Sequence, residues 1–94
     1  MTSISAKALA GNKKIKKITV GKNVTSIGKN AFSNCKNLKT ITIKTSNLKS
    51  VGKNAIKGIN SKAIIKVPKK QLKVYKKLFG KKTGFKKSIK IKKN

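Results

Sequence analysis

The sequence predicts an α+β repeat protein, in which short strands from successive similar units stack into a solenoid and a helix and a strand cap its C-terminal end. Apolar residues recur every 23 to 24 positions between residues 8 and 67. A unit of this length cannot bury its apolar residues alone, so neighbouring units must share a core. The recurrence ends at Pro68, after which the apolar spacing becomes helical.

The repeat is read from two overlapping comparisons. The apolar pattern of residues 8–20 recurs 23 positions later, at 31–43. The apolar pattern of residues 24–32 recurs 24 positions later, at 48–56. The extra residue falls between Ile43 and Leu48, where a turn can absorb it. The first set of matched pairs is Ala8 with Ala31, Leu9 with Phe32, Ile15 with Leu38, Ile18 with Ile41, and Val20 with Ile43.

Within a unit, the spacing predicts two extended pieces joined by a turn. Alternation in residues 41–43 places two β-branched side chains on one face, which favours a short strand. Val24 and Ile27 mark the second extended piece. Gly-Lys-Asn at 28–30 is a turn signal, because glycine permits unusual backbone angles. Residues 31–35 are too few for a stable α-helix, so we expect a single helical or 3₁₀ turn there.

The third unit is degenerate and leads into the cap. Ile41 and Ile43 recur as Ile65 and Val67, whereas the position of Leu38 is taken by Lys62. Such decay is typical of the last coil of a repeat array.

The segment after Pro68 is predicted to form the cap. Residues 69–79 carry apolar side chains at helical spacing after a proline that suits a helix start, and Gly80 is a plausible stop. A final strand is expected across residues 85–91. The alternative is a free amphipathic helix that lies on a membrane. The apolar residues of this tail are Leu72, Tyr75, Leu78, Phe79, Phe85, Ile89 and Ile91.

Residues Val24 to Ile43 resemble the repeat of the BspA-like leucine-rich repeat proteins, whose unit reads Val-Thr-Ser-Ile-Gly, then Ala-Phe, a small residue, Cys, Leu and a closing strand. The resemblance implies a small right-handed leucine-rich-repeat solenoid of about three turns. It divides a single domain of residues 1–94 into repeats at 8–67 and a cap at 68–94. It further implies a secreted or cell-surface adhesion protein without catalytic residues, although the first residues lack the apolar run of a signal peptide.

The charge excludes most catalytic functions. The chain has 27 lysines and no Arg, Asp, Glu or His, which gives a formal net charge of +27. General acid-base catalysis at neutral pH normally uses His, Asp or Glu, and hard metal ions need carboxylate oxygens. We therefore expect no enzyme, no cofactor and no metal site. The single Cys35 is expected to be a small buried residue, with a lysine-activated thiol as the alternative.

The predicted coils place lysines in outward columns. Rungs of a sheet lie about 4.8 Å apart, which resembles the spacing of neighbouring phosphates or sugar sulfates. Three expected strand columns are Lys16, Lys39 and Ala63; Lys17, Thr40 and Ile64; and Thr19, Thr42 and Lys66. In the turns, Lys29 is expected over Lys53, and Lys22 near Lys44. The candidate polyanion-binding residues are Lys16, Lys17, Lys22, Lys29, Lys39, Lys44, Lys53 and Lys66.

Three classes of function fit this pattern. The first is a surface module that binds anionic glycans, wall polymers or acidic protein surfaces. The second is a sequence-nonspecific nucleic-acid binder, for which Tyr75 and Phe85 are the remaining stacking candidates because Phe32 and Phe79 are expected in the core. The third is a cationic membrane-active protein. No small-molecule substrate is expected, and head-to-tail self-association stays open. A compositional preference for lysine is the alternative for any individual residue.

Overall fold

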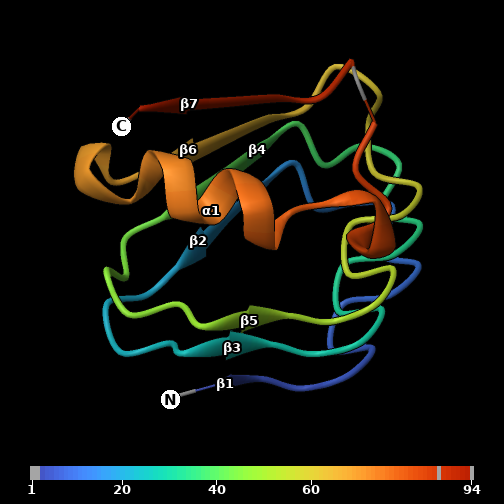
Figure 1. Cartoon of the computed structure of the whole chain (residues 1–94). Coiled ribbons are helices and arrows are strands. Elements are labelled where there is room, and N and C mark those ends of the chain that lie inside the picture. The colour runs from blue at the N-terminus through green and yellow to red at the C-terminus, as the bar shows by residue number, and fades with distance from the viewer. Residues whose placement is uncertain (1–2, 87, 94) are drawn as a thin grey trace.

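A computed structural model describes residues 3–86 and 88–93 of the chain as two parallel sheets built from successive coils (Figure 1). The short sheet has the strand order β1-β3-β5, and the long sheet has the order β2-β4-β6-β7. The short sheet consists of β1 (Ser3–Ile4), β3 (Ser26–Ile27) and β5 (Ser50–Val51). The long sheet consists of β2 (Lys17–Val20), β4 (Thr40–Ile43), β6 (Ile64–Val67) and β7 (Lys90–Lys93).

Each strand lies beside its counterpart from the next coil. In the long sheet, Lys17 is opposite Thr40, Thr40 is opposite Ile64, and Ile64 is opposite Lys90. The first two offsets reproduce the two periods read from the sequence. The ladder of the short sheet begins with Ser3, which pairs with Ser26 and lies before the stretch in which the repeat is visible by sequence. The chain therefore has a small repeat fold of parallel strands.

A third ladder joins the turns between the two sheets. Backbone N–H groups of Lys7, Asn30 and Asn54 donate to carbonyls of the next coil, at Lys29, Lys53 and Lys82 respectively, over 2.9, 3.0 and 2.7 Å. These three donors occupy equivalent positions and share a left-handed backbone, with φ of 60°, 58° and 60°. Asparagine tolerates this conformation better than most residues, which explains its recurrence.

The expectation of a single helical or 3₁₀ turn at residues 31–35 is met only in part, because tight turns form there without a helix. Amide groups of Ala31, Ser33 and Cys35 each donate to a carbonyl three residues back, which forms successive tight turns. Left-handed residues at Asn30 and Asn34 (φ 58° and 60°) prevent these turns from merging into a helix.

Gly28 and Gly52 allow the coils to approach closely. A Cβ atom on Gly28 would lie 2.5 Å from the backbone nitrogen of Ala6, and one on Gly52 would collide with the backbone of Lys29. The sequence predicts that these glycines form turns. In the structure they are needed for another reason, because a side chain at either position would collide with the neighbouring coil. Backbone therefore packs directly against backbone at this seam between coils.

Apolar side chains fill the space between the two sheets. The inward column of the long sheet contains Ile41 and Ile65, both fully buried. From the turns, Phe32, Cys35 and Leu38 enter the same core, also with no exposed surface. Burial of Phe32 and Cys35 confirms the prediction for both residues.

The cap follows Pro68 and replaces the next strand of the short sheet with a helix. It contains the 3₁₀ segment η1 (Lys69–Gln71), the helix α1 (Leu72–Leu78), a second 3₁₀ segment η2 (Lys81–Thr83) and then β7. Figure 1 shows α1 between β5 and β7, where it covers the C-terminal part of the core. The helix thus starts a turn later than predicted. The final strand is shorter than predicted, since Phe85 lies in the loop before it.

Tyr75 joins the helix to the preceding coils. Its side chain is 1% exposed, and its hydroxyl donates to the carbonyl of Thr45 at 2.8 Å. The same oxygen accepts the N–H of Leu48 at 3.1 Å. The apolar face of α1 is therefore directed into the protein, as expected for a cap and not for a free membrane helix.

Candidate functional site

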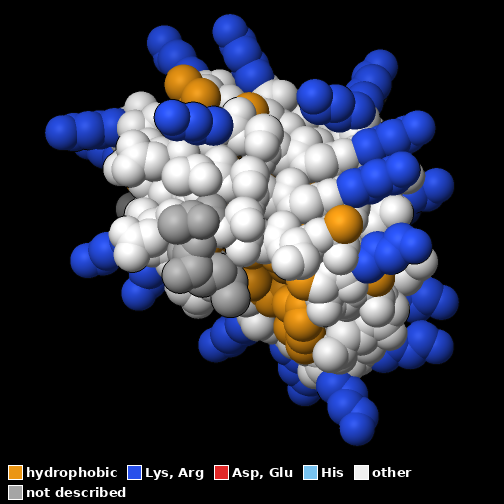
Figure 2. Space-filling model, turned by 90° about the horizontal axis from the view of Figure 1, so that it is seen from below, with side chains coloured by type: hydrophobic (Ala, Val, Ile, Leu, Met, Phe, Trp, Pro, Cys, Tyr) orange, Lys and Arg blue, Asp and Glu red, His pale blue; other side chains and the backbone are white. Residues whose placement is uncertain are grey.

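Lysines cover the surface of the protein without any carboxylate side chain to pair with them. All 27 lysines except Lys87 lie within the described residues, and each of these is exposed. Figure 2 shows lysine side chains projecting from the periphery of the face seen from below. The positive charge must therefore be balanced by ions or anionic molecules from outside the chain.

The turn ladder aligns three lysines. The carbonyls of Lys29, Lys53 and Lys82 accept equivalent hydrogen bonds from successive coils, so these residues occupy one column. The register of the short sheet agrees with this. Ile27 pairs with Val51, and two positions further along each chain segment Lys29 and Lys53 lie on adjacent rungs. Sequence analysis missed Lys82 because the inserted helix α1 breaks the regular period before it. We call Lys29, Lys53 and Lys82 the turn column.

On the long sheet, lysines concentrate at the cap. Lys66 pairs directly with Lys92 in the register of β6 and β7. Lys17 belongs to a column that continues through Thr40 and Ile64 to Lys90, so two uncharged residues separate its lysines. Lys90 and Lys92 were not identified by sequence because the offset from β6 to β7, which pairs Ile64 with Lys90, is longer than the repeat period.

Lys16 and Lys39 lie side by side just before β2 and β4. The N–H of Lys39 donates to the carbonyl of Lys16 at 2.9 Å, and the ladder continues to Ala63. The expectation that Ala63 faces outward is wrong, since this residue has no exposed surface. Its neighbour on the next rung is Ile89, 2% exposed, and both residues belong to the hydrophobic core. The lysine pair therefore ends at Lys39.

Lys22 and Lys44 lie at the opposite ends of the same strands. The N–H of Lys44 donates to the carbonyl of Val20 at 2.9 Å, which places Lys44 opposite Gly21 and one position out of register with Lys22. The eight lysines singled out by sequence thus occupy three regions. These are the start of the long-sheet strands, the outer face and far ends of those strands, and the turn column.

Comparison with protein families matches residues 1–94 to the model described as "BspA type Leucine rich repeat region (6 copies)". The chain belongs to the BspA-type leucine-rich repeat family. The match covers the cap as well as the coils, and this family is associated with bacterial surface proteins that are generally not enzymes. Neither the curated proteins nor the solved structures gave a match.

Aromatic side chains of this BspA-type repeat are mostly unavailable to a ligand. Phe32 and Phe79 are buried as predicted, at 0% and 1% exposure. The prediction of Tyr75 as a stacking residue is wrong, because its ring is in the core and its hydroxyl is bonded to the backbone. Phe85 is partly buried and packs against the core. A flat stacking platform of the kind used for single-stranded nucleic acids is therefore not available around Tyr75.

Cys35 has a structural environment. Its thiol lies 3.0 Å from the carbonyl of Leu9, to which it donates a hydrogen bond. Desolvation by burial raises the pKa of the Cys35 thiol above its ordinary value, against a smaller lowering by a backbone hydrogen bond with Asn12. The thiol is thus held protonated at neutral pH, which disfavours the alternative of a lysine-activated nucleophile.

Neither a metal centre nor a membrane span is found among residues 3–86 and 88–93. Side chains able to ligate a metal do not cluster in this part of the chain. Of its helices, none has the length and apolar character needed to cross a membrane.

Proposed function

We propose that this BspA-type repeat protein is a non-catalytic surface module that binds linear polyanions, such as anionic glycans or wall polymers, through aligned lysines. The observation that carries the proposal is the turn column, in which successive coils present Lys29, Lys53 and Lys82 at the same position. We infer that the coils wind as a short right-handed solenoid, as the family resemblance implies, which gives the column a regular direction along the molecule.

Electrostatics favours a polymeric partner over scattered small ions. Two unit charges 4.8 Å apart repel by about 0.9 kcal/mol in water, and the protein has no carboxylate side chain to offset this. A polymer with anionic groups at similar spacing neutralises several lysines at once and releases their counterions. Association should consequently be strong at low salt and weaken steeply as salt is added.

Nucleic acids and membranes are less well matched to the structure. Guanine is commonly read by arginine, which the chain lacks, and Tyr75 is buried. Binding to DNA or RNA would therefore depend on phosphates alone. On α1, Val74 is the one large apolar residue described as exposed, at 52%, while Tyr75 faces the core. The helix thus lacks an apolar face for lipid.

The first experiment compares five anionic partners in titrations at increasing salt. These are heparin, teichoic acid, duplex DNA, single-stranded RNA and anionic vesicles. We expect heparin and teichoic acid to bind best at about 0.15 M salt, with the logarithm of affinity falling linearly with that of salt concentration. Absence of binding to all five at this salt would contradict the proposal and point to a specific protein partner.

The second experiment tests alignment at constant charge. A column variant, Lys29→Gln with Lys53→Gln and Lys82→Gln, is compared with a scattered variant, Lys14→Gln with Lys49→Gln and Lys73→Gln. Both lose three positive charges at exposed positions. The column variant should bind heparin about tenfold more weakly than the scattered variant, because it loses adjacent sites. Equal affinities would show that net charge, and not alignment, controls binding.

A further inference from the structure

The two edges of the long sheet differ in their protection against a further strand. Within residues 3–86 and 88–93, the outermost strands of this sheet are β2 and β7. An outermost strand presents unpaired backbone N–H and C=O groups, and proteins commonly protect it with lysines and with charges at inward positions. β7 contains three lysines in four residues, whereas β2 contains one. Lys93 of β7 also lies opposite Val67, a fully buried residue, so it places a charge at an inward position.

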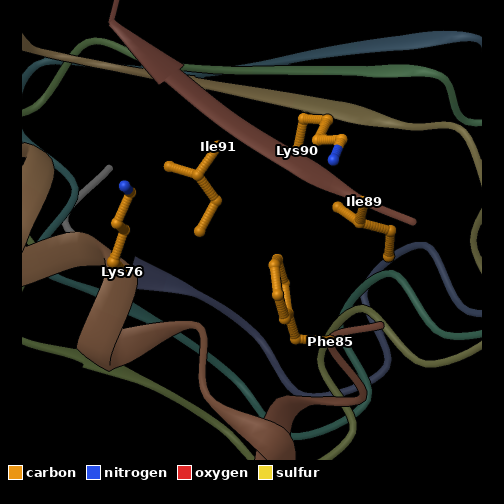
Figure 3. Close-up of a pocket in the computed structure, with 5 residues that line it drawn as sticks. All are labelled: Lys76, Phe85, Ile89, Lys90 and Ile91. Carbon is orange, nitrogen blue, oxygen red and sulfur yellow. The ribbon is translucent and has the colours of Figure 1, made fainter. Parts of the chain in front are cut away.

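The β7 edge is also covered by the cap. α1 packs against β7, and Phe85 packs against the core beside it. Figure 3 shows Ile91 and the ring of Phe85 facing the pocket beside α1, while Lys90 extends from the other face of β7. A further strand at β7 would therefore meet lysines along the edge and the cap beside it.

The first coil leaves apolar surface uncovered on the β2 side. Ile18 of β2 is only partly buried, whereas its partner Ile41 in β4 has no exposed surface. Leu9 and Ile15 are also partly buried, although their counterparts one coil later are fully buried. Figure 2 views the molecule from the side of β1 and shows apolar side chains on this face, with lysines around them. The core is therefore open on the side where a further strand would stack.

The open edge of β2 presents the backbone groups of Lys17 and Thr19. The carbonyls of Lys16 and Val20 accept N–H groups from the β4 segment at 3.2 and 2.9 Å, so they point toward β4. Successive residues of a strand direct their backbone groups to alternate sides. The N–H and C=O groups of Lys17 and Thr19 therefore point away from β4. An added strand could bond to all four of these groups without disturbing the existing sheet.

Charge selects among the strands that could fit this edge. An outward residue of an added strand would lie about 4.8 Å from Lys17, beside the exposed Lys16. A carboxylate at that position would be attracted, whereas a lysine would be repelled. A second copy of this chain is disfavoured, because it has no acidic side chain and a net charge of +27. The open edge and the exposed apolar surface thus define the place, and charge decides the kind of strand.

We propose that β2 is a docking edge for an extended segment of another protein in which acidic and apolar residues alternate. The segment joins the long sheet as a further strand, with backbone hydrogen bonds to Lys17 and Thr19. Its apolar side chains cover Ile18, and an acidic side chain lies beside Lys17. The turn column takes no part in this contact, so the inference does not depend on the proposed polymer binding.

The test uses a short blocked peptide of alternating glutamate and valine. It is titrated into isotope-labelled protein at about 0.15 M salt, and amide hydrogen exchange is followed by NMR. We expect saturable binding that slows exchange at Lys17 and Thr19 at least about fivefold, because their N–H groups gain partners, with no slowing in β7. A peptide of the same residues in two blocks should bind at least about tenfold more weakly, because it cannot direct valines inward and glutamates outward. Alternating glutamine and valine should bind about two- to fivefold more weakly.

Matched variants locate the contact. Lys17 and Lys90 are exposed and belong to the same outward column, but they lie at opposite edges of the long sheet. Lys17→Gln should weaken binding of the alternating glutamate peptide about two- to fivefold, and Lys90→Gln should leave it unchanged. Thr19→Pro removes an N–H group from the open edge and none from the ladder with β4, so it should abolish the slower exchange at Lys17.

Three results would overturn the proposal. Equal affinity for the alternating and the block peptide would show general attraction to a basic protein. Equal loss of affinity in Lys17→Gln and Lys90→Gln would show that the peptide does not bind at β2. A dimer of the protein in sedimentation experiments that Thr19→Pro disrupts would show that a second copy occupies this edge. The two lysine variants change exposed side chains only, so they remain informative even where Thr19→Pro does not fold.

Discussion

A lysine occupies a backbone conformation that its equivalents fill with asparagine. Lys7, Asn30 and Asn54 share one position of the coil and φ values of 58° to 60°. Side chains other than glycine are strained in this region, and asparagine suffers least because its short amide can bond locally. The residue at this position is therefore well suited to its backbone conformation in the second and third coils but not in the first.

Replacement of Lys7 by asparagine should stabilise the protein. We expect Lys7→Asn to raise the free energy of unfolding by about 0.5 to 1 kcal/mol, measured by urea denaturation. Lys14→Asn is the control, since Lys14 is also exposed but has no left-handed backbone. Each variant removes one positive charge, so equal gains in both would assign the effect to charge and not to conformation.

The buried thiol of Cys35 should react slowly with alkylating reagents. Because burial raises its pKa, the thiol is protonated at pH 8 in the folded protein and ionises more readily in the unfolded chain. Iodoacetamide should modify native Cys35 at least about tenfold more slowly than the urea-unfolded chain at this pH. The folded state retains the proton longer, so the contribution of this thiol to stability is present below about pH 9 and is lost as the pH rises further. Equal alkylation rates would contradict this assignment.

At the scale of elements, a side-chain hydroxyl group joins the helix of the cap to the coils, in addition to the backbone bonds that the rest of the cap makes with them. The oxygen of Tyr75 joins α1 to the turn after β4, where it contacts both Thr45 and Leu48. A helix as short as α1 has little stability alone, so this anchor and the apolar packing around it position α1. Loss of the hydroxyl leaves a buried N–H and a buried carbonyl without this partner.

We expect Tyr75→Phe to lower the free energy of unfolding by about 1 to 3 kcal/mol. Thermal denaturation measures the loss, and hydrogen exchange at the Leu48 amide localises it. Thr83→Val provides a comparison, since the hydroxyl of Thr83 bonds within the cap to Gly80 at 2.7 Å and does not join α1 to the coils. Faster exchange at Leu48 in Thr83→Val, but not in Tyr75→Phe, would contradict the role given to the anchor.

The regular elements could be predicted from the sequence, whereas their irregular neighbours could not. Alternating β-branched residues identified β4 and β6, because each inward position is filled by a residue of similar shape. Asn30 and Asn34 decided the conformation of the turns, but asparagine is equally common in ordinary loops. Likewise, the positions of the outward lysines of β7 could not be predicted, because they depend on how many residues the cap inserts between β6 and β7. Its helix could be expected from apolar spacing, whereas the register that sets Lys90 beside Ile64 is decided by three-dimensional packing.

The candidate site divides in the same way. A fixed period was enough to align Lys29 with Lys53 and Lys16 with Lys39, since both pairs lie within the regular coils. Lys82 belongs to the cap, where no repeat in the sequence relates one residue to another. An outward position was expected for Ala63 because its column begins with two exposed lysines, whereas its side chain belongs to the hydrophobic core.

Across the whole molecule, like charges oppose folding. A net charge of +27 is confined within principal extents of 30 × 27 × 21 Å, and unfolding lets the lysines move apart. The screening length falls from about 30 Å at 0.01 M salt to about 8 Å at 0.15 M. At low salt every lysine therefore repels most others, whereas at physiological salt repulsion is limited to near neighbours such as those of the turn column.

Salt should consequently stabilise this protein. Repulsion between neighbouring lysines of the turn column should persist in part even at the higher salt concentration. Between 0.01 and 0.15 M sodium chloride, we expect the midpoint of thermal unfolding to rise by about 5 °C, equivalent to roughly 1 kcal/mol for a domain of this size. The column variant should exceed the scattered variant in midpoint at both salt concentrations, because its lysines lie on adjacent rungs, and a rung spacing of about 4.8 Å is within the screening length throughout. A midpoint independent of salt would show that bound anions already neutralise the lysines. Identical midpoints for the two variants would remove the physical basis for treating the column as a unit.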